Sequence, residues 1–220
     1  MSAAADPKSV YWQVKLEKVK TALEGNGFTV SIHTGLDDAA RHVTETVVPR
    51  EKPRTVGFGG SQTVLDSGVL ERIRDLPGIE LLDARAPGLS TTEIVELRRR
   101  MLLSDLYFSS SNALTMDGKL VNRDCFGNRV GALHFGPRKV VLLIGRNKIC
   151  ASVEEAVTRV RTVASPMNSL RLRRDTPCVK TGVCMDCKSP DRICSVWTLT
   201  EKCFPRERIH IQIINAEAGF

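Results

Sequence analysis

Four cysteines lie within seventeen residues near the carboxyl end of the chain, at Cys178, Cys184, Cys187 and Cys194. Thiolates are soft ligands, and four of them on a short loop can form a tetrahedral sulfur site for an iron–sulfur cluster or for zinc. The residues between them are compact and turn-forming, as a loop around a metal requires. A disulfide knot and unrelated buried thiols are the alternatives to a metal site.

The pattern of the four cysteines favours iron–sulfur over zinc. No histidine lies between Cys178 and Cys194, which excludes a mixed cysteine–histidine zinc finger in this segment. A zinc ribbon usually has two C-x-x-C pairs, whereas here only Cys184 and Cys187 form one. We therefore expect these four thiols to ligate an iron–sulfur cluster, with zinc as the alternative.

A loop of small residues at positions 57–63 is the first candidate for a ligand site. It follows an apolar strand and precedes a helix, so the backbone N–H groups around Gly59, Gly60, Ser61 and Thr63 can point at an anion. The loop lacks the lysine of a Walker A motif, and Gln62 occupies the third glycine position of a dinucleotide-binding fingerprint. A tight turn capped by the serine is the alternative.

A polar window at positions 109–130 is the second candidate. We expect it to follow a buried strand, at the carboxyl edge of the sheet where α/β proteins place their ligands. Arg129, at the start of a helix, is the most plausible anion clamp. These polar groups can instead satisfy the backbone of a loop, since Asp-Gly is a strong turn signal. The candidate residues of this window are Asp117, Gly118, Asn122, Asp124, Asn128 and Arg129.

Cys125 lies in the same window, away from the four clustered cysteines. Its neighbours Arg123 and Arg129 can lower the pKa of a thiol and make it a nucleophile. A histidine partner for such a nucleophile cannot be assigned from the sequence. An unreactive thiol is the alternative.

Helical and strand-like segments alternate along the chain and must position these groups. Short apolar strands separated by amphipathic helices predict an α/β fold with a mostly parallel sheet and helices on both faces. Ser90 and Glu93 form a capping box at the start of one helix, and Pro49 is expected to end another. The expected helices cover residues 12–23, 36–47, 65–76, 90–101, 127–135 and 153–164, and the expected strands cover 28–32, 55–58, 79–82, 105–109, 139–144 and 208–214. We divide the chain into an α/β domain at 1–165 and, at 166–220, a small cysteine-rich metal-binding appendage with a closing strand.

Composition narrows the class of protein. The 220 residues carry a formal charge of +7, but only 5% of them are aromatic, which leaves little material for base stacking and makes a nucleic-acid partner unlikely. A small anionic metabolite is the expected partner. No apolar run approaches the roughly 18 residues of a membrane span, and there is no secretory signal, so neither membrane insertion nor export is expected. The odd number of cysteines suits the reducing cytoplasm.

Taken together, these segments resemble the LUD-domain family, the lactate-utilisation proteins of the LutC/YkgG type. The resemblance covers nearly the whole chain and is closest to a short subfamily with a cysteine-rich tail. The matching stretches are 56–63, 112–122, 127–130, 136–140, 147–149 and the tail from Thr176 onward. The family usually has Gly-Thr where this chain has Cys125 and Phe126, a bulkier pair that is expected to narrow the pocket.

The resemblance implies a fold similar to the sugar-phosphate-isomerase and CoA-transferase-like proteins. In that fold a loop like Gly59–Thr63 holds a phosphate, and a turn like Asp117-Gly118 lines the same pocket. It also implies a [4Fe–4S] cluster and a part in oxidising L-lactate or a related 2-hydroxy acid, with iron–sulfur partner subunits or as a homo-oligomer. A non-redox isomerase or transferase acting on a sugar phosphate or CoA thioester, with a structural metal, is the alternative. A zinc-stapled adaptor is the third.

Overall fold

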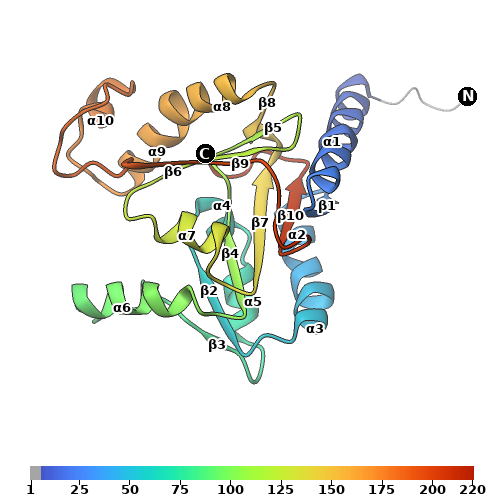
Figure 1. Cartoon of the computed structure of the whole chain (residues 1–220), viewed down its shortest axis with the longest axis horizontal. Coiled ribbons are helices and arrows are strands. Elements are labelled where there is room, and N and C mark those ends of the chain that lie inside the picture. Colours follow the sequence, from blue (N-terminus) through green and yellow to red (C-terminus); the bar gives the residue numbers. More distant parts are fainter. Residues whose placement is uncertain (1–5) are drawn as a thin grey trace, which may run out of the picture.

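The computed structural model describes residues 6–220, and a six-stranded parallel sheet forms its centre. Neighbouring strands are parallel throughout this sheet (Figure 1). From one edge to the other they are β1 (Thr29–His33), β10 (Ile209–Ile214), β7 (Lys139–Gly145), β4 (Leu106–Ser109), β2 (Thr55–Phe58) and β3 (Glu80–Leu81). The predicted α/β fold with a mostly parallel sheet is confirmed.

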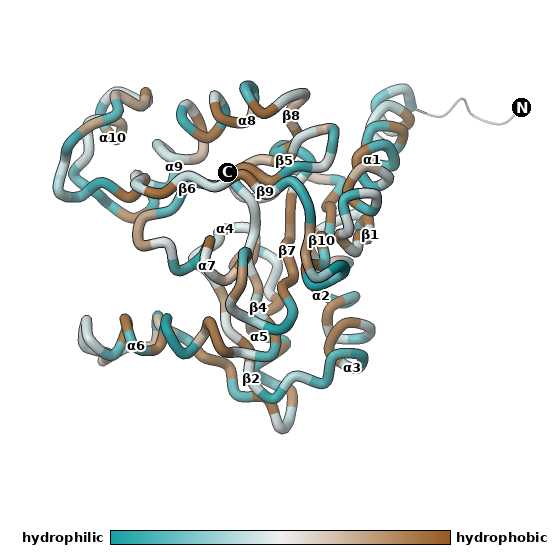
Figure 2. Tube along the Cα trace, in the orientation of Figure 1, coloured by the Kyte–Doolittle hydropathy of each residue, from teal (hydrophilic) through white to brown (hydrophobic). Residues whose placement is uncertain are grey.

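The interior strands are apolar because helices cover them on both faces. All six residues of β10 are buried, and so are the last six of β7. Figure 2 shows β7 as an almost unbroken hydrophobic segment. Such continuous runs are typical of parallel strands with no solvent-facing side.

Helices cover both faces of the main sheet, as predicted, and each face has its own hydrophobic core. One core packs α1, α6 and α7 against the sheet, and the other packs α2, α3, α4 and α5 against its opposite face. The helices are α1 (Pro7–Gly25), α2 (Leu36–His42), α3 (Val48–Glu51), α4 (Gln62–Asp66), α5 (Val69–Arg74), α6 (Thr91–Met101) and α7 (Asn128–His134). The predicted capping box is present at α6, where Ser90 and Glu93 each bond the other's backbone N–H.

Pro49 does not end its helix, so that prediction is wrong. The segment passes from α2 through a π-helical turn, η1 (Val43–Val47), into α3 and ends at Lys52, whose φ is 47°. In the wider turn the N–H of Val48 donates to the carbonyl of Val43, five residues back. Pro49 therefore falls in the first turn of a new helical register, where a missing N–H is tolerated.

The same arrangement recurs at Pro166. There α8 (Val153–Arg159), the π-helical turn η3 (Val160–Ala164) and α9 (Ser165–Arg171) form one continuous helical segment. The predicted domain boundary at residue 165 lies inside this segment. The chain after it also returns to the main body, because β10 is an interior strand between β1 and β7. The appendage is therefore limited to the segment that bears the cysteines.

The polar window at 109–130, interpreted from the sequence as a ligand site or a self-satisfied loop, contains a hairpin of a second sheet. This sheet has the order β8-β5-β6-β9 and lies across the upper ends of the main strands in Figure 1. Its strands are β5 (Ala113–Thr115), β6 (Leu120–Asp124), β8 (Ile149–Cys150) and β9 (Val196–Thr200). Some polar side chains of this window satisfy its own backbone: Asn122 Oδ1 accepts from the N–H of Asn112, and Asn112 Oδ1 accepts from the N–H of Arg123.

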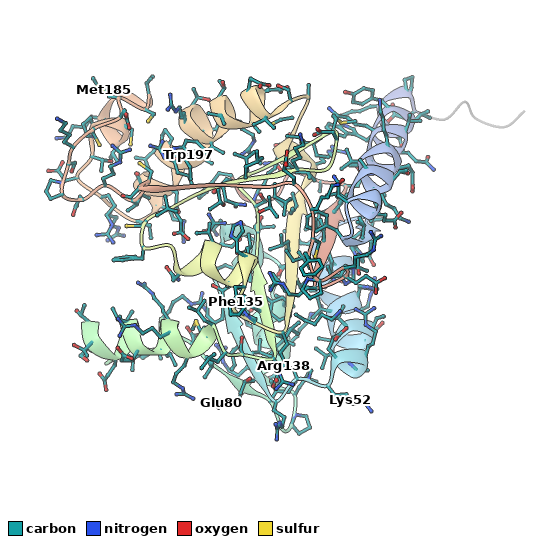
Figure 3. The ribbon with its side chains drawn as sticks, in the orientation of Figure 1. Lys52, Glu80, Phe135, Arg138, Met185 and Trp197 are labelled. Atoms are coloured by element: carbon teal, nitrogen blue, oxygen red, sulfur yellow. The ribbon has the colours of Figure 1, made fainter. Side chains whose placement is uncertain are left out.

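The cysteine-bearing segment connects α9 to β9 and includes the short helix α10 (Pro177–Thr181). It lies at one end of the second sheet, remote from α1 (Figure 1). Trp197 of β9, labelled in Figure 3, lies beside this segment and packs under the guanidinium of Arg123, 4.6 Å from its ring centroid. Within residues 6–220, no helix has both the length and the apolar character that crossing a membrane requires.

Candidate functional site

A cavity of about 250 Å³ opens at the carboxyl ends of the central parallel strands. Its wall includes Ser61 after β2, Ser110 after β4 and Lys148 after β7. From β2 the chain moves outward to β3 and then crosses to β4 on the other side of β2. The connections that leave β2 and β4 therefore run in opposite directions along the sheet. Open α/β sheets bind ligands at such a point, beside the carboxyl ends of the two strands.

The lining of the cavity is strongly basic. Seven basic side chains and one acid, Asp124, line it among the described residues. The basic residues include Arg98, Arg123, Arg129, Lys148, Arg171 and Arg174. Cations gathered around a partly desolvated space attract an anion and disfavour a cation.

Arg129, the predicted anion clamp, lines the cavity, but its guanidinium also holds the wall together. Nη1 donates to the carbonyl of Ser110 and to Asn122 Oδ1, at 3.1 and 2.7 Å. Nη2 donates to Asn112 Oδ1 and to the carbonyl of Arg123, both at 3.0 Å. Both terminal nitrogens are thus occupied by the protein, and Arg129 joins α7 to the ends of β4 and β6.

The predicted glycine loop contributes some of its members to the cavity. Gly60 and Ser61 line it, and Ser61 also caps α4 by accepting from the N–H of Val64. Gly59 serves close packing, since a Cβ there would lie 3.0 Å from Cγ of Arg129. Thr63 is fully buried, and its hydroxyl donates to the carbonyl of Ala218.

The Asp117-Gly118 turn lies away from the cavity, at the tip of the hairpin between β5 and β6. Asn26, just after α1, donates its side-chain amide to the carbonyls of both residues, at 2.9 and 3.1 Å. Gly118 has a φ of +80° and contacts the backbone of α1 so closely that a Cβ would lie 2.9 Å from Leu23 N. Here the turn docks the hairpin onto α1.

The remaining predicted residues of the window lie at or behind the cavity wall. Asp124 and Asn128 line it, and Asp124 Oδ2 accepts from the N–H of Val130 in the first turn of α7. Asn122 is fully buried behind Arg129, and its amide nitrogen has no partner among the described residues. The structure thus brings Gly60, Ser61, Asp124, Asn128 and Arg129 to one cavity.

Lys148 is the cavity residue that sequence reasoning missed. It ends the short turn η2 (Arg146–Lys148) after β7, and only 3% of its surface is exposed. Burial, together with the nearby charges of Arg159 and Arg129, lowers the pKa of this lysine to about 7. The available signal was a lysine three residues after a strand that is almost entirely apolar.

All four clustered cysteines line a second, much smaller cavity of about 10 Å³. They are half-buried free thiols. Among residues 6–220, no three histidine, cysteine or acidic side chains converge as metal ligands. The thiols therefore share one cavity, and binding a metal requires them to turn toward one another.

The chemistry of this donor set fits a thiophilic metal. Four thiols border one space, and the guanidinium of Arg123 lies next to them, with Nη1 donating to Cys184 Sγ at 3.7 Å. Burial raises the pKa of Cys194, while the charges of Arg123 and Arg192 act in the opposite direction. Metal binding would have to displace that proton.

The surroundings of Cys125 favour the unreactive alternative over an activated thiol. Burial and the neighbouring Asp124 raise the pKa of Cys125, and these effects exceed the opposing influence of Arg174 and Arg98. Its thiol donates to the carbonyl of Arg192 at 3.6 Å. Cys125 thus lines the cavity as a protonated thiol, and we assign it no nucleophilic part.

The fold and the cavity define a class: an α/β protein with a basic cavity at the carboxyl edge of a parallel sheet. Within that class the chain belongs to the LUD-domain family, because the family model described as "LUD domain" matches residues 16–214. This confirms the family resemblance seen in the sequence.

A solved structure shows the same fold. The chain is similar to a DUF162 family protein from Deinococcus radiodurans, with a TM-score of 0.53 and 13% identity over 93% of this chain and 98% of that one. At this identity the likeness concerns the fold alone. No curated protein matches the chain.

Proposed function

We propose that this LUD-domain protein binds a small anionic metabolite in the basic cavity and takes part, in the cytoplasm, in oxidising L-lactate or a related 2-hydroxy acid. We further propose that Cys178, Cys184, Cys187 and Cys194 hold a [4Fe–4S] cluster. Partner subunits, or further copies of the chain, would complete the reaction. The family supplies the link to lactate utilisation, and the cavity supplies the argument for an anion.

One residue carries the argument that the two sites work together. Arg123 lines the basic cavity, and its guanidinium also contacts the cysteine segment through Cys184 Sγ and, from Nε, the carbonyl of Cys194 at 3.1 Å. Its side chain is only 2% exposed. A bound anion and a sulfur-ligated metal would thus be separated by one buried cation that stabilises negative charge on both sides. A cluster there would supply electron transfer.

The size of the cavity defines what the anion can be. At about 250 Å³ it is smaller than the roughly 300–1,000 Å³ typical of pockets for drug-sized ligands. A three- or four-carbon acid suits this space better than an intact CoA thioester. We therefore expect L-lactate and pyruvate, tested as separate ligands by calorimetry, to bind, and acetyl-CoA not to bind.

Anaerobic purification followed by iron and sulfide analysis tests the cluster. We expect a brown protein, and we expect iron to be lost in Cys184→Ser and Cys187→Ser. Cys203→Ser is the matched control, because Cys203 is buried near α1, away from the cysteine segment, and should leave the iron content unchanged. A colourless protein with stoichiometric zinc would contradict the redox proposal.

The small volume between the four thiols favours one second candidate, a non-redox enzyme with a structural zinc. A cavity of about 10 Å³ accommodates a single ion with less movement than a cluster needs. In that case Cys184→Ser would lower the melting temperature while the protein retained its affinity for the anion. Metal analysis and calorimetry on the same preparation separate the two candidates.

A further inference from the structure

Lys148 occupies the floor of the basic cavity and has unusual hydrogen-bond partners. Its Nζ donates to Thr63 Oγ1 at 2.8 Å and to Ser110 Oγ at 3.0 Å. Both partners are neutral hydroxyls, and no carboxylate lies within ion-pair distance of Lys148 among residues 6–220. A lysine this deeply buried is normally paired with an acid.

The two hydroxyls match a neutral amine better than an ammonium ion. The Thr63 hydroxyl donates its proton to the carbonyl of Ala218, and the Ser110 hydroxyl donates to the carbonyl of Ser111. Each hydroxyl must therefore accept from Lys148. A neutral amine uses both of its N–H groups in this way and keeps a free lone pair, whereas an ammonium ion would have a third N–H with no partner among the side chains and backbone that the structure describes.

Two of the surrounding charges act in the same direction, and only the weaker influence of Asp66 opposes them. The guanidiniums of Arg159 and Arg129 oppose a positive charge on Lys148, and burial opposes it more strongly. A desolvated lysine beside other cations is the usual way in which proteins prepare an amine nucleophile. Lys148 is thus held as an amine in a cavity that attracts anions.

Two arginines that line the same cavity as Lys148 can hold a carboxylate. Arg98 stacks over Phe126, 5.5 Å from its ring centroid, and has no acidic partner among the described residues. Arg171 is oriented by Asn168, whose Oδ1 accepts from Nε and Nη2 at 3.1 and 2.7 Å. Oriented guanidiniums of this kind bind carboxylates through paired hydrogen bonds.

We infer that Lys148 forms an imine with a small 2-oxo acid bound in the basic cavity. The Lys148 nitrogen bonds to the ketone carbon, both N–H protons of the amine pass to the carbonyl oxygen, and that oxygen leaves as water. The acid remains attached through a C=N bond. The step consumes no oxidant or reductant. The inference rests on the proposed function, since a 2-oxo acid is the product of oxidising a 2-hydroxy acid, and it names the chemical class that the cavity retains.

Borohydride reduction tests this directly, because it converts the imine into a stable secondary amine. We expect the full chain, treated with pyruvate and sodium cyanoborohydride, to gain the mass of pyruvate less one oxygen atom. Peptide mapping should place the adduct on Lys148 in the unmodified protein. L-Lactate, which has no ketone, should give no adduct.

Two variants provide the matched comparison. Lys148→Met should abolish the adduct, whereas Lys139→Met should retain it, because Lys139 is half-buried away from the cavity and bonds the carbonyl of Glu207. Mapping in the unmodified protein remains decisive if Lys148→Met fails to fold. An adduct spread over surface lysines, or none with pyruvate, 2-oxobutyrate or glyoxylate, would overturn the inference.

The outcomes separate this inference from the proposed function. Pyruvate binding by calorimetry without an adduct would overturn the imine and leave the anion site intact. An adduct on Lys148 in a protein that contains no iron would support the imine and overturn the cluster. Failure to bind any of these acids would overturn both.

Discussion

Arg129 joins three segments of the chain through one guanidinium group. Its terminal nitrogens make four hydrogen bonds, to the segment after β4, to β6 and to the asparagines at the ends of the hairpin. The planar fork of arginine fits these acceptors in a way that the single ammonium of lysine cannot. The residue that looked most like an anion clamp thus also serves to build the cavity.

We expect Arg129→Lys to lower the free energy of unfolding by about 2–4 kcal/mol, because it removes charge-assisted hydrogen bonds and leaves buried acceptors unpaired. Urea denaturation measures the change. Arg138→Lys is the control: Arg138, at the surface in Figure 3, has an 83% exposed side chain, and its exposed ion pair should contribute only about 0–1 kcal/mol. Equal losses in the two variants would contradict the structural part given to Arg129.

A second group of polar residues lies under α2, between β1 and β10. The Ser31 hydroxyl is 2.8 Å from His33 Nε2 and 3.0 Å from His210 Nε2. The ring of His42 lies 4.9 Å from that of His33 and 5.7 Å from that of His210. Burial lowers the pKa of all three, that of His210 to about 3.

These histidines make folding stability depend on pH in the acid range. Their folded-state pKa values lie below the ordinary value of 6.5, so below that pH the unfolded chain binds protons that the folded chain does not. Stability is therefore fully present above pH 6.5 and falls as pH decreases toward 3. His210, whose folded-state pKa is about 3, contributes a slope of about 1.4 kcal/mol per pH unit within this window, and His33 and His42 act in the same direction.

We expect His210→Gln to flatten the dependence of unfolding free energy on pH between 6.5 and 5, whatever its effect at neutral pH. Urea denaturation at several pH values measures the slope. His134→Gln, at an exposed position on α7, should keep the slope of the unmodified protein. If His210→Gln has the same pH dependence of unfolding free energy as the unmodified protein, the histidine group under α2 is not the cause of that dependence.

At the scale of elements, the hairpin β5–β6 shows how a turn can dock one element on another. The Asp117-Gly118 tip rests against the end of α1, and Asn26 bonds both of its carbonyls. Gly118 is required twice over, by its φ of +80° and by its contact with the backbone of α1. Any side chain here would push the hairpin away from the helix.

We expect Gly118→Ala to destabilise the protein by about 1–3 kcal/mol more than Gly78→Ala. Gly78 has a φ of +76°, nearly the same, but a Cβ there would meet nothing within 4 Å. The backbone strain of the added Cβ should be similar at the two positions, so the difference in stability measures the steric clash with α1. Thermal denaturation of the two variants measures it, and equal shifts would indicate that the hairpin does not press on α1.

At the scale of the whole molecule, the carboxyl end of the chain completes the centre of the fold. After the cysteine segment, β9 pairs with β6 in the second sheet, and β10 then inserts between β1 and β7 in the main sheet. The cysteine segment is thus anchored at both ends to the core. Its position beside the basic cavity follows from this anchoring.

We expect a chain that stops after Glu201 to lose cooperative unfolding, because β1 would have no neighbouring strand in the main sheet. A chain that stops after Asn215 keeps all of β10 and should unfold cooperatively, although it lacks the bonds from Asn147 to Ala218 and Gly219. Circular dichroism during heating distinguishes the two. Cooperative melting of the shorter chain would contradict the central place of β10.

Local sequence patterns were sufficient to predict the elements whose signals come from neighbouring residues. The apolar run from Lys139 to Ile144 predicted β7, because strands covered on both faces need no polar side. Ser90 and Glu93 predicted the start of α6, because a capping box involves neighbours only three residues apart. The motifs also indicated the LUD-domain family before the fold was known.

Which side chains come into contact depends on the tertiary structure. Lys148, Thr63 and Ser110 follow three different strands and are brought into hydrogen-bond distance only when β7, β4 and β2 align in the sheet. Asp117 and Gly118, close to Asn122 in sequence, are carried away from the cavity because the hairpin extends toward α1. Local sequence patterns show the spacing of apolar residues and the positions of turns. A site depends instead on contacts between residues that are distant in sequence, and those contacts form only on folding.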